Sequence, residues 1–172
     1  MRFEDAPLQW FTEGNDHDST RKTLPPKPGQ NNLWHKTTRR ANDFGHSPVT
    51  SWYYGIDAQG TYDTGTRSWG RLISPSITVP AGARLELQVN QLVNVEGGNY
   101  ETPTIQVSVA GGAWQNVFQR NGRNTSFFGD RVDLSRFLGQ TIRLGFFIDT
   151  KDGNFNTFEG WYVDDVLVTF WP

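Results

Sequence analysis

Residues 83–93, ARLELQVNQLV, alternate apolar and polar side chains with a period of two. A β-strand points successive side chains to opposite faces, so this pattern is typical of a strand with a core on one face and water on the other. Residues 102–120 form two shorter runs around Gly111 and Gly112, which predicts a β-hairpin. The only helical signal is a single turn over residues 134–139, and no βαβ alternation occurs. The sequence therefore predicts an antiparallel, all-β fold.

Further strands are predicted wherever aromatic and β-branched residues cluster, because these side chains suit a pleated, half-buried surface. Aromatic residues make up 14% of the chain, which indicates an aromatic core. The additional strand segments are 3–11, 32–38, 50–57, 71–80, 141–150 and 159–170. The last two flank a polar stretch and are expected to form a second hairpin. About ten strands without a dominant helix indicate a two-sheet antiparallel β-sandwich, a jelly roll.

A single domain, residues 1–172, is expected to contain all of these strands, because a chain of this length suits one core. Residues 13–32 are polar and contain three closely spaced prolines, which predicts a long surface loop. A strand-like segment follows the first methionine at once, and the chain ends directly after the last strand. We expect a domain excised from a larger secreted protein.

Charge and composition exclude several classes of function. The net charge of −2, without a continuous basic stripe, gives no reason to expect nucleic acid as a partner. No apolar run is long enough to span a membrane, since a span needs about 18 residues. The chain has no cysteine, which excludes disulfides, zinc–thiolate sites and cysteine nucleophiles. This suits the cytosol or a bacterial exported protein that uses ions in place of disulfides.

Two adjacent carboxylates lie in the middle of the last predicted strand, EGWYVDDVLVTF. They are Asp164 and Asp165, and regular alternation would turn at least one of them towards the apolar side of the strand. A buried, unpaired carboxylate costs several kcal/mol, so a neutralising partner is required.

The order of seven segments resembles the MAM-like jelly-roll domains of secreted bacterial peptidases, the immune inhibitor A group, and the related cleaved adhesins. The segments are FEDAPLQW, LWHKTT, SWYYGIDAQGTYDTG, GRLISPSITVP, VSVAGGAWQNV, RVDLSRFLGQTIRLGFFIDT and EGWYVDDVLV. Residues 13–32 and 121–129 lie outside the resemblance. It implies a jelly roll, a secreted or cell-surface bacterial location, and a calcium site that joins the first strand to the last. The missing cysteines argue against cell adhesion of the animal MAM type.

Calcium is accordingly the predicted cofactor, with Glu4, Asp5, Asp164 and Asp165 as ligands. If the terminal strands are neighbours, these four carboxylates repel one another unless a cation or protons neutralise them. Calcium accepts about six to eight oxygen ligands without strict geometry. The alternative is a purely structural arrangement, with hydrogen bonds from loop amides or an ion pair with Arg2.

A second oxygen-rich stretch occurs in residues 149–159, DTKDGNFNTFE. Its spacing differs from that of an EF-hand, and Asp, Asn and Gly at a hairpin tip are also what a turn requires. Turn formation is therefore the favoured interpretation. The polar side chains concerned are Asp149, Asp152, Asn154, Asn156 and Glu159.

Catalytic motifs are weak in this sequence. The three histidines have no metal-ligand spacing, no HExxH occurs, and GHSPV at 45–49 is not a nucleophile elbow. The dipeptide His46-Ser47 is given no role. We expect a non-catalytic, calcium-stabilised accessory or binding domain of a secreted bacterial hydrolase, most plausibly a peptidase. Its partner would be the catalytic domain of the parent protein, or an extracellular protein or glycan, and the domain itself would be monomeric.

The alternative functions are a carbohydrate-binding module and a cell-surface adhesin domain. Exposed aromatic rings stack on sugars, and Tyr62, Trp69 and Tyr100 lie in loop-like surroundings suited to this role. The same rings could instead cover the rim of the core. Most of the remaining tryptophans are expected to be core residues.

Overall fold

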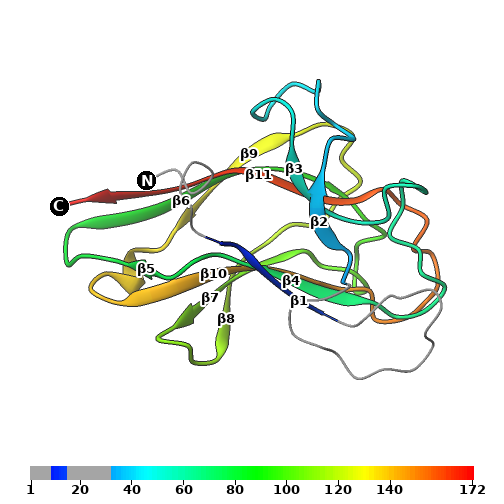
Figure 1. The fold of residues 1–172 in the computed structure, drawn as a ribbon. Helices are drawn as coiled ribbons and strands as arrows, with labels where there is room; N and C mark the ends of the chain where they lie inside the picture. The colour runs from blue at the N-terminus through cyan, green and yellow to red at the C-terminus, as the bar shows by residue number, and fades with distance from the viewer. Residues whose placement is uncertain (1–8, 15–31) are drawn as a thin grey trace.

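Two antiparallel β-sheets packed face to face make up the described part of the protein, as Figure 1 shows for the computed structural model. The structure describes residues 9–14 and 32–172. In one sheet the order is β1-β4-β10-β7-β8, with β5 paired to β10, and in the other it is β2-β3-β11-β6-β9. This confirms the predicted all-β sandwich. Within the described ranges, no helix has the length and hydrophobicity needed to cross a membrane.

Most strand bounds follow the predicted segments, but β1 lies mostly beyond the predicted segment 3–11, and no segment predicted β9. The six-stranded sheet contains β1 (Phe11–Gly14), β4 (Trp69–Ile73), β5 (Ile77–Thr78), β7 (Thr104–Val109), β8 (Trp114–Gln119) and β10 (Thr141–Asp149). The five-stranded sheet contains β2 (Trp34–Thr37), β3 (Ser51–Tyr54), β6 (Arg84–Asn94), β9 (Phe128–Asp133) and β11 (Gly160–Trp171).

One of the two predicted hairpins is confirmed and the other is wrong. Strands β7 and β8 pair around a turn in which Ala110 and Gly111 have positive φ. Strands β10 and β11, by contrast, belong to different sheets, so residues 150–159 carry the chain across the end of the sandwich. Local patterns show that two strands follow each other but not which sheet each one joins. Strand β9 was missed because its short, polar sequence resembles a loop.

The polar loop predicted over residues 13–32 is wrong at its first two residues. Glu13 and Gly14 belong to β1, where they pair with Arg71 and Gly70 of β4. Residues 15–31 lie outside the described residues, as do Glu4 and Asp5. The described part of the N-terminal strand therefore lies in the sheet opposite to β11.

The core between the sheets is aromatic. Trp161 of β11 is fully buried and packs edge-on against Trp34 of its own sheet and Phe146 of the other, with ring centroids 5.3 and 5.9 Å apart. Its indole N–H donates to Oε1 of the buried Gln91 at 2.9 Å. Gln91 also donates to the carboxylate of Asp130 at 2.6 Å. These bonds offset the cost of an inward-facing amide in β6.

A single helical turn, Ser135–Phe137, follows β9, in agreement with the turn predicted over residues 134–139. The Ser135 side chain does not cap the turn. Instead the carboxylate of Asp133 accepts a hydrogen bond from the N–H of Ser135 at 2.8 Å. Gly139, with a φ of +75°, follows the turn at the position where a left-handed residue ends a helix.

Gly160, the first residue of β11, lies where that strand closely approaches β3. Substituting it tests how tightly the two strands pack. Its φ is +117°, and an added Cβ would clash with the carbonyl oxygen of Tyr54. We expect Gly160→Ala to lower the free energy of unfolding by about 2–4 kcal/mol, measured by urea denaturation. Gly139→Ala is the matched control, because Gly139 also has positive φ but no atom within 4 Å of an added Cβ, and should lose only about 1 kcal/mol. Equal losses would contradict the steric explanation.

Candidate functional site

A β-bulge in β11 decides where the two adjacent aspartates point. The pairing of β11 with β6 shifts register between Asp164 and Leu167, and Asp165 has a φ of +47°. Trp161 and Val163 face the core, so Asp164 lies on the outer face of the sheet. The bulge interrupts alternation, and Asp165 remains on that outer face too. The expectation that one carboxylate faces the core is therefore wrong.

Asp164 is buried beneath residues 38–50, which cover the outer face. Its Oδ2 lies 2.8 Å from Nδ1 of His46, and its Oδ1 accepts the N–H of Asp165 at 2.9 Å. Nε2 of His46 lies 2.8 Å from the carbonyl oxygen of Arg40. Since that carbonyl can only accept, Nε2 carries a hydrogen, and one further proton is shared between Nδ1 and Asp164. Burial raises the pKa of Asp164, and the contact with His46 partly offsets this rise.

Asp165 and an apolar cluster hold the same covering segment in place. Oδ2 of Asp165 accepts the main-chain N–H of Ser47 and the side-chain N–H of Asn90, each at 2.8 Å. The ring of His46 stacks on Phe127 with centroids 4.0 Å apart. Phe127 belongs to a second buried cluster, which also contains Tyr53, Leu92 and Tyr162. The dipeptide His46-Ser47, to which no role was given, thus provides the main partners of both aspartates.

The four-residue calcium site stays a prediction. Glu4 and Asp5 lie outside the described residues, while both oxygens of Asp164 and one oxygen of Asp165 already accept protein donors. No described residue donates to Oδ1 of Asp165, which leaves that oxygen for a cation. Across residues 9–14 and 32–172, no three His, Cys, Asp or Glu side chains converge as metal ligands.

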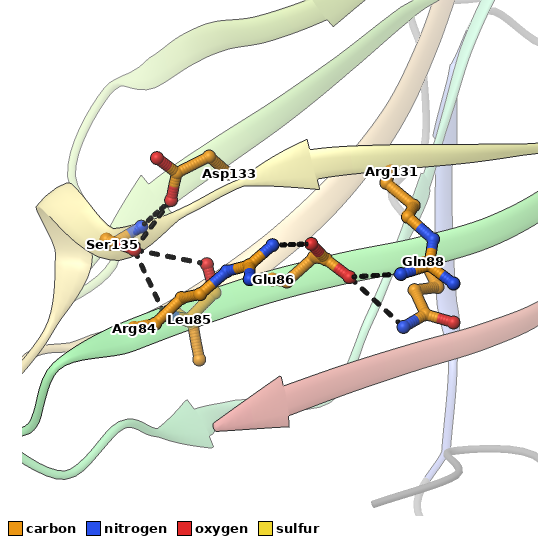
Figure 2. A network of polar contacts seen from close by, with 7 residues as sticks. All are labelled: Arg84, Leu85, Glu86, Gln88, Arg131, Asp133 and Ser135. Atoms are coloured by element: carbon orange, nitrogen blue, oxygen red, sulfur yellow. Dashed lines mark hydrogen bonds and ion pairs between the residues drawn. The ribbon is translucent and has the colours of Figure 1, made fainter. Parts of the chain in front are cut away.

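A polar hollow of about 590 Å³ lies on the outer face beside the bulge, and we call it the five-strand hollow. Its lining residues are Gly45, His46, Ser47, Gln88, Val89, Asn90, Gly129, Asp130, Arg131, Asp165 and Leu167. Of these described lining residues, none is Trp, Tyr or Phe. Figure 2 shows the network at its rim, where the buried carboxylate of Glu86 contacts Arg84, Gln88 and Arg131. These contacts hold Gln88 and Arg131 in fixed positions.

A second hollow, of about 210 Å³, lies on the outer face of the other sheet, and we call it the six-strand hollow. It combines aromatic rings with amide, hydroxyl and charged side chains. The lining residues are Asn99, Tyr100, Thr102, Thr104, Gln106, Asn116, Gln119, Phe147, Asp149 and Lys151.

A stacked arginine orders the floor beside the six-strand hollow. The guanidinium of Arg71 lies 4.7 Å from the ring centroids of both Trp114 and Phe147. Trp114 lies across Gly145, where an added Cβ would be 2.7 Å from the indole ring, so glycine is required there. Burial lowers the pKa of Arg71 to about 10, which leaves it charged at neutral pH. It forms an ion pair with Glu13.

The polar groups of the six-strand hollow are held in fixed orientations. Arg71 donates to Oε1 of Gln106 at 2.9 Å, and Nε2 of Gln106 donates to Oδ1 of Asn116 at 2.8 Å. Asp149 accepts both arms of Arg67, at 2.9 and 2.6 Å. Burial would raise the pKa of Asp149, but the bonds from Arg67 and from the N–H of Lys151 outweigh it and lower the pKa. Asp149 is therefore a carboxylate at neutral pH.

The three aromatic residues suggested by the sequence have different environments. Tyr62 is fully buried and its hydroxyl accepts the N–H of Glu96 at 3.0 Å, so the prediction that it stacks on a ligand is wrong. Tyr100 is half exposed and lines the six-strand hollow. Trp69 is partly buried on the same face, with its ring 6.3 Å from that of Phe147. Trp114 was not predicted as a site residue, because it was expected to be one of the core tryptophans.

Comparison with known proteins gives one similar sequence and a shared fold, and no family model matches the chain. The chain is 28% identical over 117 residues to bacillopeptidase F of Bacillus subtilis (strain 168), a match that covers 67% of this chain but 8% of that protein. The structure of TmCBM61 in complex with β-1,4-galactotriose matches with a TM-score of 0.55 and 13% identity, over 95% of this chain and 88% of that one.

A third similarity is to the K3 cleaved adhesin domain of Lys-gingipain from Porphyromonas gingivalis w83. That match has a TM-score of 0.41 and 14% identity, and it covers 80% of this chain and 91% of the adhesin domain. At these identities, the TmCBM61 match supports the β-sandwich fold and nothing further.

The pair His46 and Asp164 should contribute strongly to stability. His46→Ala leaves the buried carboxylate without its main partner, so we expect a loss of roughly 2–4 kcal/mol in the free energy of unfolding. Ser47→Ala is the matched control, because it keeps the main-chain N–H that bonds Asp165 and removes only a 3.5 Å contact to Asp164. It should change stability by less than about 0.5 kcal/mol. Similar losses in the two variants, measured by chemical denaturation, would refute the assigned role of His46.

Proposed function

We propose that this chain is a non-catalytic carbohydrate-binding domain whose ligand lies in the six-strand hollow. The observation that carries the proposal is the combination of Tyr100 and Phe147 with ordered amides and the carboxylate of Asp149 in one hollow. An aromatic ring packs against the C–H face of a sugar, while amides and carboxylates bind its hydroxyl groups.

The polar side chains of the hollow are held in place without a ligand, and this supports the assignment. Gln106 accepts a hydrogen bond from Arg71 and donates one to Asn116, so these amides lose little conformational entropy when a ligand binds. The hollow, at about 210 Å³, is smaller than the roughly 300–1,000 Å³ typical of sites for drug-sized ligands. This size suits one or a few units of a glycan chain, with the remainder lying along the sheet.

The arrangement around His46 supports a binding role over a catalytic one. Both ring nitrogens of His46 have partners, Asp164 and the carbonyl of Arg40. The hydroxyl of Ser47 lies 3.5 Å from Asp164, so it bonds the acid and not the imidazole that would activate it. These residues do not form the nucleophile–base pair of acyl transfer.

The proposal also covers the parent protein of this domain and where the domain acts. Similarity to a segment of bacillopeptidase F supports attachment to a peptidase, as in the MAM-like domains that the sequence resembles. The domain would act outside the bacterial cell, as a monomer that holds its parent enzyme near a glycan-bearing substrate. A calcium ion bound by Glu4, Asp5, Asp164 and Asp165 would stabilise it.

Retention on insoluble polysaccharides tests the function, with β-1,4-galactan in the panel because TmCBM61 was solved with a galactotriose. We expect Tyr100→Ala and Asn116→Ala to weaken binding about tenfold or more, since each removes a direct contact, and Trp69→Ala to weaken it as well. Dissociation constants from calorimetry with soluble oligosaccharides would measure the effect.

Two controls separate this site from its alternatives. Phe44→Ala removes an aromatic ring that is 95% exposed and distant in sequence from the hollow, so it should bind normally. Arg131→Ala alters the five-strand hollow and should also bind normally. Loss of binding in Arg131→Ala with retention in Tyr100→Ala would move the site to the other sheet. No retention on any polysaccharide would refute the proposed function.

A further inference from the structure

Three buried oxygen atoms at one end of the sandwich have no hydrogen-bond donor. They are both carboxylate oxygens of Glu101 and Oδ1 of Asn156. Glu101 is 0% exposed and Asn156 is 1% exposed. A buried acceptor without a partner costs about 1–3 kcal/mol, and more when it is charged. Three of them at one end of the molecule therefore need an explanation.

The orphaned acceptors lie on the two loops that meet at this end. Glu101 belongs to residues 95–103, which join β6 to β7, and Asn156 belongs to residues 150–159, which join β10 to β11. The buried Tyr62 connects the two loops. Its N–H donates to the carbonyl of Phe158 at 3.3 Å, and its hydroxyl accepts the N–H of Glu96 at 3.0 Å.

The surroundings of Glu101 are electronegative. Burial, together with the negative charges of Glu96 and Asp152, raises the pKa of Glu101 to about 7. The N–H groups of Gly97 and Glu101 are near enough to lower this pKa, but neither has the geometry of a hydrogen bond to the carboxylate. Arg123 stacks on Phe158 and donates to the carbonyl of Glu96 at 3.5 Å. It leaves the carboxylate of Glu101 unpaired.

The other polar residues of the second loop already have partners. Asp149 accepts the N–H of Lys151, and Asp152 accepts the N–H of Asn154, each two residues further on. Both aspartates thus serve turn formation, as the sequence indicated, and Glu159 pairs with Arg40. Asn156 differs from them. Its Nδ2 donates to the carbonyl of Asp152 at 3.2 Å, while its Oδ1 has no donor.

We propose that Glu101 and Asn156 bind a calcium ion between these two loops. The three orphaned atoms on these two loops are all oxygen acceptors, which is the ligand type that calcium prefers. A bidentate carboxylate and one amide oxygen would supply three ligands, and main-chain carbonyls and water would complete a shell of about six to eight. A site with a single coordinating acid agrees with the absence, among the described residues, of any cluster of three acidic or histidine ligands.

The ion would also brace the six-strand hollow. Tyr100 and Thr102, on either side of Glu101, line that hollow, as does Lys151 at the start of the second loop. Calcium would fix both loops in their observed positions. This consequence rests on the proposed glycan site, whereas ion binding itself does not.

Calcium titration of EDTA-treated protein, followed by calorimetry and thermal unfolding, tests the site. For the unmodified chain we expect a rise in Tm of roughly 5–10 °C at a hundredfold excess of calcium over its Kd. Magnesium should give a smaller rise, because it requires near-ideal octahedral geometry. Glu101→Gln should abolish the part of the calcium response that belongs to this site, which is the part that Asp165→Asn retains. Its Tm in EDTA should equal or exceed that of the unmodified chain, because a buried charge has been removed, and a misfolded variant would not show this.

Two more variants complete the test. Asn156→Asp adds a charged ligand, so it should lower the Tm in EDTA and bind calcium more tightly. Asp165→Asn should keep the calcium response of this site. The proposal is overturned if the unmodified chain does not respond to calcium, if Glu101→Gln leaves the response of an Asp165→Asn background unchanged, or if Asp165→Asn alone abolishes the response. If the protein binds calcium but no glycan, the calcium proposal stands and only the proposed function is refuted.

Discussion

Trp161 lies between the two sheets, and its packing sets the register on which the rest of the structure depends. The ring contacts Trp34 in one sheet and Phe146 in the other, and its N–H bonds Gln91 in the adjacent strand. With Trp161 and Val163 turned inwards, Tyr162 and Asp164 must face outwards. The bulge at Asp165 then restores the inward direction at Val166 and leaves both carboxylates outside the core. A single tryptophan therefore determines where the paired aspartates of β11 act.

The two outer faces of the sandwich differ in what the described residues place on them. On the five-stranded sheet, residues 38–50 pack over Asp164 through His46 and Phe127. On the six-stranded sheet, Arg71 and the rings beside it form an ordered but accessible floor. A sugar requires an accessible aromatic ring next to fixed polar groups, and this combination occurs at the six-strand hollow.

The end of the sandwich at which residues 95–103 and 150–159 meet differs chemically from both outer faces. Strands β10 and β11 lie in different sheets, so the chain between them crosses the open edge of the core and brings its polar groups inside. Most of these groups bond within their own turns, as Asp149 and Asp152 do. Asn156 does not bond through its Oδ1, and neither carboxylate oxygen of Glu101, on the loop between β6 and β7, has a donor. These unpaired oxygens are the basis of the proposed cation site.

Period-two alternation, the glycine turn at 111–112 and the aromatic content were sufficient to predict most of the strands, one hairpin and the two-sheet fold, because each depends on neighbours along the chain. Strand β9 was not predicted, because its short sequence is polar. The sequence also showed that Asp164 and Asp165 need partners. Only the tertiary structure identified those partners, since Asp164 and His46 are 118 residues apart and no local pattern connects them. It also decided that Tyr62 is buried, that β10 and β11 separate, and that Glu101 has no donor, because burial depends on which strands become neighbours in space.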